Sequence, residues 1–347
     1  MKQKNSLKTI ASILLSFVLI FAFSACSQND DSSEKPDTSV DIEETINMVS
    51  GDYEFVGSSD NTVTIAKYIG KDINIEIPRE IDGKKVTAIG NVSKEKGVFQ
   101  DRTKLVSVVI PDGVIEIQDN AFRGCTSLKT VRIPASVTSL GNYAFYNCPS
   151  LYAIYFKGNA PQVGNYVIEP VPYLDIYHYE GTEGWTNPWH DLSMSSYRES
   201  GEYYYEVNDD NTVTIIKYIG KGVDIVIPSE IDGMKVEALG NSSQSAGAFQ
   251  DCTTLASVVI SEGIIAILDN SFKGCTSLNT VTIPASVTII WHAAFDDSPN
   301  LQSIYFEGGP PQTGNYLFDY RSPLTIYYHE DADGWTNSWY ERPTKIY

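Results

Sequence analysis

The amino-acid sequence predicts a β-rich solenoid of two tandem blocks, with parallel strands on the inner face and short helical or 3-10 turns on the outer side. Three observations lead to this fold class. The chain contains one long segment twice, each copy contains a shorter period, and each period contains a strand-like pattern that ends at a proline. Periods of this kind are typical of chains whose units stack along one axis.

The long repeat has an offset of 150 residues. The segment DNTVTIAKYIGK at 60–71 returns as DNTVTIIKYIGK at 210–221. More than half of the positions in 51–189 are identical to their counterparts in 201–339. The two segments are therefore copies of one block, and each is long enough to bury a core of its own.

This duplication predicts the domain organisation of the chain. The first block should end near Trp189, and the second should begin near Gly201. The residues between them form a joint that could be either a stiff rod or a hinge. The expected parts are a signal peptide at 1–25, an acidic tether at 26–50, the first block at 51–189, the joint at 190–200 and the second block at 201–347.

Each block contains a period of 23 residues. A phenylalanine, a leucine and a further apolar residue hold fixed places in each period. One coil of this length cannot cover its own apolar side, so stacked coils must cover one another. The residues are Phe99, Phe122 and Phe145, Leu105, Leu128 and Leu151, and Ile110, Ile133 and Phe156, followed by Phe249, Phe272 and Phe295, Leu255, Leu278 and Leu301, and Ile260, Ile283 and Phe306.

A single coil shows how the period folds. Val131 and Ile133 alternate with Arg132, which predicts a short strand with one apolar face directed inward. Pro134 has no backbone N–H to donate, so it should end the strand. The segment 144–148, AFYNC, is expected to close the coil as a short helical turn.

The coil pattern resembles a known repeat family. Leu-x-x-Val-x-Ile-Pro, then Val-x-x-Ile, then Ala-Phe-x-x-Cys-x-x-Leu is similar to the BspA-like, or Treponema-type, leucine-rich repeats of bacterial surface proteins. The match covers nearly all of 51–340, including a closing pattern at 326–335, although Val98 and Ser271 replace the alanine. The resemblance implies a curved leucine-rich-repeat solenoid with parallel inner strands, and a role in attachment to host proteins or to other cells.

The ends of each block depart from the 23-residue pattern. Val63–Ile65, Ile73–Ile77 and Val86–Ile89 alternate apolar and polar residues, which indicates irregular first coils that cap the stack. At the other end, Trp185 and Trp189 are expected to cover the last coil of the first block.

The first residues of the chain form an export signal. Lys2, Lys4 and Lys8 precede an apolar run at 10–23, and small residues follow it. An α-helix of fourteen residues rises about 21 Å, which is less than the roughly 30 Å hydrocarbon core of a bilayer. A transmembrane helix is therefore the weaker alternative to a signal that is removed.

Cys26 indicates which kind of signal this is. The segment 21–26, FAFSAC, resembles the lipobox of bacterial lipoproteins, with Phe23 where leucine is usual. The resemblance implies that Cys26 is acylated through its thiol and anchors the protein in a membrane through a diacylglyceryl group. The alternative is ordinary cleavage near Ala25, which leaves a free cysteine.

Charge limits the possible partners. The formal net charge is −19, and the signal contains lysines but no acid, so its removal makes the chain more negative. The acidic tether after Cys26 has no aromatic residue and should be disordered. So negative a protein is not expected to bind nucleic acid or to adhere to anionic lipid.

The four cysteines beyond Cys26 could be bridged or free. Neighbouring strands lie about 4.8 Å apart, which is within disulfide reach, and an exported protein can meet oxidising conditions. The same place in other coils holds Arg102 or Ser298, however, so it accepts unpaired residues. We favour free buried thiols, because buried cysteine packs as a small apolar residue. The two pairs are Cys125 with Cys148 and Cys252 with Cys275.

The sequence contains no pattern that predicts a metal, a cofactor or catalysis. There is no Cys-x-x-Cys, no histidine ligand spacing, no phosphate-binding loop and no nucleophile elbow. The segment 331–334, DADG, resembles part of a calcium loop, but the remaining ligands are missing, and we interpret it as a turn.

The inner strand face is the remaining candidate site. Exposed tyrosine gives contact area at small entropic cost and is enriched at interfaces, although tyrosine and threonine also favour β structure for its own sake. The faces of the two blocks differ, so they need not bind the same partner. The candidate residues are Lys129, Arg132, Tyr152 and Tyr155 in the first block, and Asn279, Thr282, Gln302 and Tyr305 in the second.

These observations predict a cell-surface lipoprotein, held outside a bacterial cell through Cys26, that binds an extracellular protein through the inner face of the solenoid. Carbohydrate binding at the surface is one alternative, and a structural spacer without a ligand of its own is another. A monomer is favoured, and no enzymatic activity is expected.

Overall fold

The computed structural model describes residues 48–90, 96–169, 171, 174–192, 194–241 and 246–347. The export signal, the lipidation site Cys26 and the tether up to residue 47 lie outside the described residues. Within these ranges, no helix has the length and apolar character needed to cross a bilayer.

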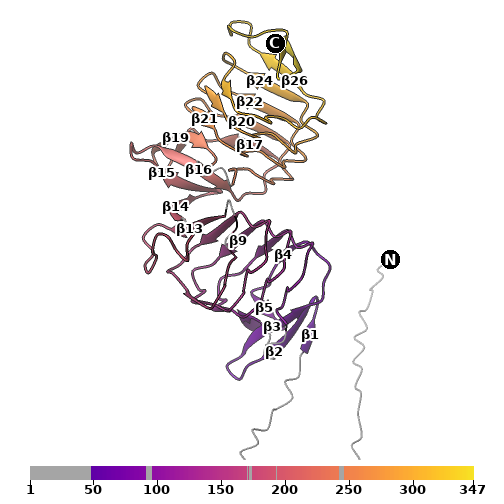
Figure 1. Cartoon of the computed structure of the whole chain (residues 1–347), viewed down its shortest axis with the longest axis vertical. Helices are drawn as coiled ribbons and strands as arrows, with labels where there is room; N and C mark the ends of the chain where they lie inside the picture. The colour runs from indigo at the N-terminus through magenta and orange to yellow at the C-terminus, as the bar shows by residue number, and fades with distance from the viewer. Residues whose placement is uncertain (1–47, 91–95, 170, 172–173, 193, 242–245) are drawn as a thin grey trace, which may run out of the picture. The chain divides into compact units, whose positions relative to one another are not determined.

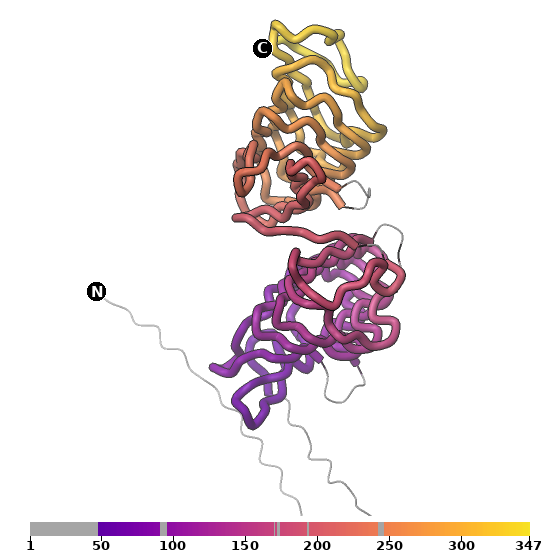
Figure 2. The backbone as a smooth tube through the Cα atoms, turned by 90° about the vertical axis from the view of Figure 1, so that its left-hand side faces the viewer, coloured from indigo at the N-terminus to yellow at the C-terminus, as the bar shows by residue number. Residues whose placement is uncertain are grey.

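The described chain consists of strands and turns that stack as coils (Figures 1 and 2). The inner strands of each block pair in parallel with their neighbours, so the predicted fold class is confirmed. In the first block they are β4 (Asn74–Glu76), β7 (Ser107–Val109), β9 (Thr130–Ile133), β11 (Ala153–Phe156), β13 (Asp175–Tyr179) and β14 (Met194–Ser200). In the second block they are β17 (Asp224–Ile227), β20 (Ser257–Ile260), β22 (Thr280–Ile283), β24 (Ser303–Phe306), β26 (Thr325–Tyr328) and β28 (Arg342–Ile346).

A second set of strands runs along another side of the coils. It begins in each block with longer strands that form hairpins and continues as two-residue strands. In the first block these are β1 (Met48–Ser50), β2 (Tyr53–Gly57), β3 (Thr62–Tyr68), β5 (Glu80–Ile81), β6 (Lys84–Ile89), β8 (Glu116–Ile117), β10 (Ser139–Leu140) and β12 (Gln162–Val163). In the second block they are β15 (Tyr203–Val207), β16 (Val213–Tyr218), β18 (Glu230–Ile231), β19 (Met234–Leu239), β21 (Ala266–Ile267), β23 (Ile289–Ile290) and β25 (Gln312–Thr313), and β27 (Ser338–Trp339) pairs with β28.

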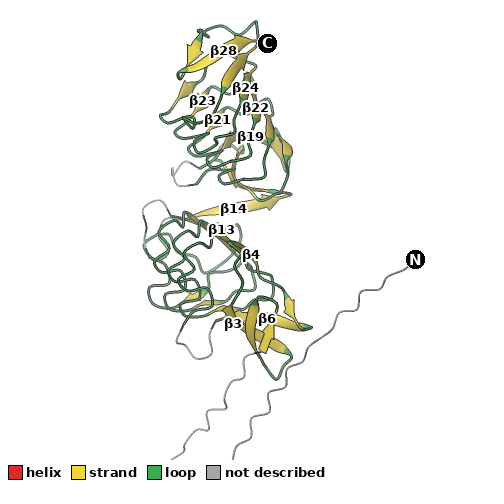
Figure 3. Ribbon diagram, turned by 90° about the vertical axis from the view of Figure 1, so that its right-hand side faces the viewer, coloured by secondary structure: helices red, strands yellow, loops and turns green. Residues whose placement is uncertain are grey.

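Strand β14 occupies most of the segment between the two blocks (Figure 3). Its first half pairs in parallel with β13 of the first block, and its second half pairs antiparallel with β15 of the second. One strand thus belongs to both stacks, and a single sheet of thirteen strands runs from β4 to β25.

The core of each block lies between its two strand sets. Val131 and Ile133 are buried and Arg132 is not, and β9 ends immediately before Pro134, as the sequence predicts. The repeated phenylalanines form a stack along the axis of each block. Ring centroids are 5.0 Å apart for Phe99–Phe122, 5.2 Å for Phe122–Phe145, 4.9 Å for Phe249–Phe272 and 5.2 Å for Phe272–Phe295.

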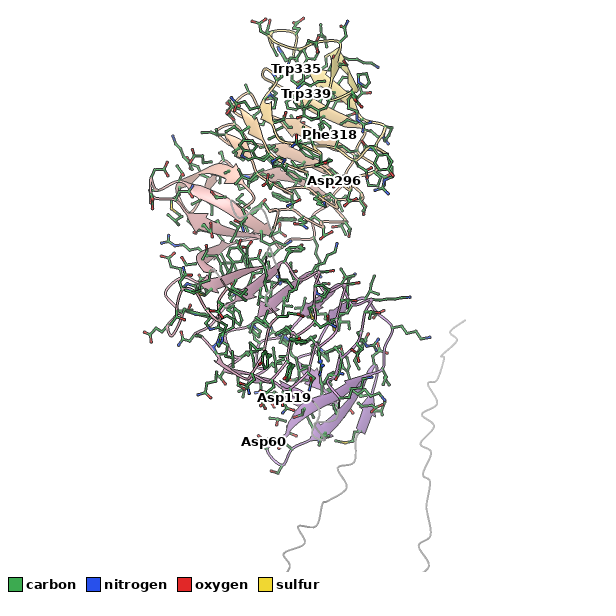
Figure 4. The ribbon with its side chains drawn as sticks, in the orientation of Figure 1. Asp60, Asp119, Asp296, Phe318, Trp335 and Trp339 are labelled. Carbon is green, nitrogen blue, oxygen red and sulfur yellow. The ribbon has the colours of Figure 1, made fainter. Side chains whose placement is uncertain are left out.

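Tryptophans close the last coil of each block, which confirms that expectation. Trp185 and Trp189 lie 4.9 Å and 5.3 Å from Phe156, measured between ring centroids. In the second block Trp335 and Trp339 take the same place at the C-terminal end, and Phe318 packs beside Trp339 (Figure 4).

The outer side differs from the expected helical turns. No α-helix or 3-10 helix is assigned in the described ranges, and single turns with i to i+3 hydrogen bonds stand in their place. The physical reason is backbone conformation. Asn120 and Gly124 have φ values of 58° and 72°, and a residue in the left-handed region interrupts a right-handed helix. The segment between them is too short to form a helix.

The described cysteines are free thiols. Cys125 Sγ donates to the carbonyl of Phe99, one coil earlier, at 3.1 Å, and Cys275 makes the same bond to Phe249 at 3.1 Å. Ser298 repeats it with a hydroxyl, donating to Phe272 at 3.0 Å. The position therefore accepts a small buried donor to the preceding coil, and either cysteine or serine supplies one.

We expect these thiols to resist alkylation while the protein is folded. Burial raises the pKa of Cys125 to about 12 and that of Cys148 to about 11, and only the thiolate reacts. Treatment with iodoacetamide at pH 8, followed by mass spectrometry, should leave both unmodified in the native protein and modify both in denaturant. Labelling of Cys125 in the native protein at the rate of a free thiol would contradict this account of the site.

Candidate functional site

The inner face of each block presents one row of side chains, because the middle residues of its parallel strands pair in register. These residues point away from the core, so they form the surface that the sequence proposes as a binding face. In the first block the row is Glu76, Val109, Arg132, Tyr155, Tyr177 and Ser195. In the second block it is Val226, Val259, Thr282, Tyr305, Tyr327 and Lys345.

Tyr155 points away from the core of the first block as expected, but the expectation that it is exposed is wrong. Its exposed fraction is 1%, because the second block covers it. The ring stacks on Tyr177 at 4.8 Å, and Tyr204 of β15 lies 5.3 Å from it between centroids. Burial holds the pKa of the Tyr155 hydroxyl well above its usual value.

Lys129 and Tyr152 are also used within the chain. Both contact Asp251 of the second block: Lys129 Nζ lies 2.6 Å from one carboxylate oxygen, and the Tyr152 hydroxyl donates to the other at 3.2 Å. Three of the four candidate residues in the first block therefore hold the two blocks together in this structure.

Arg132 is half-buried at the edge of this contact. Arg132 and Tyr204 line a groove of about 630 Å³ together with Glu76. The groove lies between the inner face of the first block and the first hairpin of the second. Tyr155 also lines this groove, although only 1% of its surface is exposed, so Arg132 is the more accessible of the two candidates there.

The candidates of the second block remain accessible. Tyr305 is half-buried and stacks on Tyr327, with ring centroids 4.8 Å apart and planes 15° apart. Thr282 and Asn279 are half-buried, and Gln302 is exposed. The row continues to Val259 and Val226, which are 41% and 64% exposed, so an apolar strip extends from the tyrosines to β17.

Several residues of this surface were missed from the sequence. Tyr177 and Tyr327 complete the tyrosine pairs, but each follows its partner by 22 residues, so a 23-residue period does not find them. Tyr204 and Asp251 were missed because their contacts cross between blocks. An alignment that allowed one deletion before β13 could have found the tyrosines.

The side chains of this surface are of the kinds that pack against another protein surface. Within the described ranges, no group of three or more histidine, cysteine or acidic residues is placed to hold a metal ion. The first-block face is closed by aromatic rings and ion pairs, and the second-block face offers tyrosine, threonine, amide and aliphatic side chains.

The repeats match one family, and the chain is similar to several solved structures. A profile described as BspA type Leucine rich repeat region (6 copies) matches residues 93–177 and 242–332, just over half of the chain. A leucine-rich cell surface protein from Faecalibacterium prausnitzii is 22% identical, over 82% of this chain and 94% of that one, with a TM-score of 0.29.

Two further structures are of the same kind. The Leucine Rich Repeat protein of T. pallidum is 19% identical, over 80% of this chain and 91% of that one, with a TM-score of 0.28. The pneumococcal vaccine antigen PcpA is 14% identical, over 82% and 87%, with a TM-score of 0.28. No curated protein matches the sequence.

Proposed function

Because the chain belongs to the family of BspA-type leucine-rich-repeat proteins, we propose that it is a bacterial surface lipoprotein that binds an extracellular protein through the inner face of its second block. Lipid on Cys26 would hold it at the membrane, and the acidic segment after Cys26 would separate the folded part from the bilayer. The first block would then serve mainly to position the second.

The accessibility of the second-block row carries this proposal. The equivalent row of the first block loses Tyr155 and Tyr177 to contact with the second block, whereas Tyr305, Tyr327, Val259 and Val226 keep exposed surface. Tyrosine beside aliphatic residues, with few charges at the centre, is typical of the core of protein–protein interfaces. A parallel sheet also presents this surface as a rigid unit, which lowers the entropic cost of binding.

Carbohydrate capture is the second candidate, and a different surface favours it. Tyr316 and Tyr320 are 82% and 86% exposed, and they border a groove of about 260 Å³ together with Tyr340. Exposed aromatic rings around a small groove suit the apolar face of a sugar ring. None of the residues that line this groove belongs to the inner strand row, so the two candidates can be tested by separate substitutions.

The experiment that tests the proposal is binding of residues 48–347, which contain both cores, to a panel of extracellular-matrix proteins and glycans at physiological salt. We expect saturable binding to a protein, weakened at least tenfold by Tyr305→Ala, because a buried interface tyrosine commonly contributes 2 kcal/mol or more, as an order of magnitude. Tyr166→Ala, which changes an exposed tyrosine of the first block, is the matched control.

Each of the other results has a definite meaning. Binding to glycans alone, reduced by Tyr316→Ala and not by Tyr305→Ala, would favour the second candidate. Protein binding that is unchanged by Tyr305→Ala and by Gln302→Ala would refute the second-block face as the site. Binding to no member of the panel by a folded protein would count against a general adhesion role.

A further inference from the structure

The same three tyrosines recur at the last inner strands of both blocks, and the third of them in the second block directly follows β28. Tyr155, Tyr177 and Tyr197 in the first block correspond, 150 residues later, to Tyr305, Tyr327 and Tyr347 in the second. Their geometry is also the same. The first two rings stack at 4.8 Å in both blocks, and the third ring meets the first edge-on, at 5.8 Å for Tyr197 and 5.2 Å for Tyr347. We call Tyr305, Tyr327 and Tyr347 the tyrosine seat.

The two clusters differ in what covers them. In the first block a fourth ring, Tyr204 from the β15–β16 hairpin, packs 4.6 Å from Tyr197 and 5.3 Å from Tyr155 between centroids. Ile216 of the same hairpin joins the cluster. The three first-block tyrosines are almost fully buried as a result.

In the second block no described ring takes the place of Tyr204. Tyr327 and Tyr347 are the two described rings in contact with Tyr305, and Tyr347 remains 46% exposed. The seat therefore has the form of a protein-binding surface, and the chain itself shows which kind of structure occupies its counterpart.

We propose that the tyrosine seat binds an aromatic side chain presented on a β-hairpin of a partner protein, as Tyr204 is bound by the first block. The inference rests on the proposed function and deepens it, because it names the chemistry of the partner. Aromatic rings packed on one another favour offset or edge-on contacts of the kind that Tyr204 makes, so an aromatic residue fits better than an aliphatic one.

A second copy of this chain is not the expected occupant. The residues equivalent to Tyr204 and Ile216 in the first hairpin of the first block are Glu54 and Ala66. Glu54 is held by Lys67 at 2.9 Å. Head-to-tail stacking would press this carboxylate against the rings of the seat, and burial of a charge against apolar surface is unfavourable.

The rim of the seat indicates the charge of the partner. In the first block Lys157 pairs with Glu199 at 2.8 Å, next to the covered tyrosines. The equivalent of Lys157 is Glu307, which is exposed. Glu199 lies at the end of β14, on the strand that leads into the β15–β16 hairpin. Because Glu307 reverses the sign of Lys157, the strand that leads into a partner hairpin on the seat is expected to carry a lysine or arginine in the place of Glu199.

The test uses the hairpin of this chain as the probe. A cyclised peptide of residues 198–220 contains Glu199, Tyr204 and Ile216, and cyclisation is needed because an isolated hairpin is marginally stable. It is titrated into residues 48–347 with isotope-labelled tyrosine, and binding is followed by NMR. We expect saturable binding, weakened at least tenfold by Tyr305→Ser in the protein or by Tyr204→Ser in the peptide. Tyr166→Ser, at an exposed tyrosine of the first block, is the control.

The charge reversal supplies a second measurement. Glu307→Lys should strengthen binding of the same peptide about two- to fivefold, because it restores a lysine opposite Glu199. A peptide with Glu199→Lys should show the opposite preference. If both peptides bound the Glu307→Lys protein and the unchanged protein equally well while Tyr305→Ser still weakened binding, the expectation about the partner's charge would be refuted. The expectation of an aromatic side chain would stand.

The proposal is overturned if the Tyr204→Ser peptide binds as well as the unchanged peptide, if Tyr305→Ser has no effect, or if no binding is seen at millimolar peptide. It is also overturned if simple glycosides, and not the hairpin, shift the signals of the seat tyrosines. These outcomes are separable from failure of the proposed function. Binding of a matrix protein that is unaffected by Tyr305→Ser would uphold the proposed surface-binding function and exclude the seat as its site. Binding of the hairpin peptide without binding of any panel member would uphold the seat and count against the proposed function.

Discussion

Replacement of Phe272 by alanine should lower the free energy of unfolding by about 3–5 kcal/mol, the usual range for loss of a buried aromatic ring. Phe272 is fully buried and stacks between Phe249 and Phe295. Because each coil contacts only its neighbours, one missing ring weakens two coil-to-coil contacts at once. The effect should appear as a lower midpoint in urea denaturation followed by circular dichroism.

Two variants make this result interpretable. Phe122→Ala changes the equivalent ring of the first block, and a similar loss is expected because its neighbours lie at similar distances. Tyr316→Ala removes an aromatic side chain that is 82% exposed, and it should change stability by less than about 0.5 kcal/mol. A loss of under 1 kcal/mol for both phenylalanines would show that the ring stack contributes little to stability.

The stack could be predicted because it depends on one repeated coil. Burial of Phe122, Leu128, Val131 and Ile133 follows from a pattern that recurs every 23 residues, and parallel pairing follows from stacking identical coils. The tryptophan caps could be predicted for a similar reason, since an exposed last coil needs an apolar cover.

The backbone conformation of the outer turns could not be predicted from the sequence. A segment such as Ala-Phe-x-x-Cys is compatible with a helical turn, and nothing in its composition shows that Asn120 will adopt a left-handed conformation. Asparagine tolerates that region better than most residues, but it also occurs in helices and strands. The stacking of coils determines the conformation, and this is a tertiary effect.

The candidate residues are covered in the first block and accessible in the second, and this difference also depends on tertiary structure. Alternation along β11 correctly places Tyr155 on the side away from the core, but it does not show what lies above that side. The cover comes from β15, which follows β14 back across the end of the first block. Tyr155 and Tyr305 both stand in the segment Ile-Tyr-Phe, so the strand pattern alone does not distinguish a covered tyrosine from an accessible one. The path of the following chain makes that distinction.

That distinction leads to opposite expectations for two equivalent substitutions. Tyr155→Ala should destabilise the protein by about 3–5 kcal/mol, because it removes a ring that packs on Tyr177 and Tyr204. Tyr305→Ala should have a much smaller effect on unfolding and a large effect on partner binding, because its ring is only partly covered. Urea denaturation of both variants, measured beside binding, separates the two roles.

Tyr155→Phe sharpens the comparison. The Tyr155 hydroxyl has no hydrogen-bond partner in the described part of the chain, and a buried polar group without a partner costs about 1–3 kcal/mol. Tyr155→Phe keeps the ring and removes that group, so it should leave stability unchanged or raise it. If Tyr155→Phe were as damaging as Tyr155→Ala, the hydroxyl and not the ring would hold the blocks together. If Tyr155→Ala had no effect on unfolding, the contact between the blocks would be too weak to cover that face, and Tyr155 would return to the set of accessible binding residues.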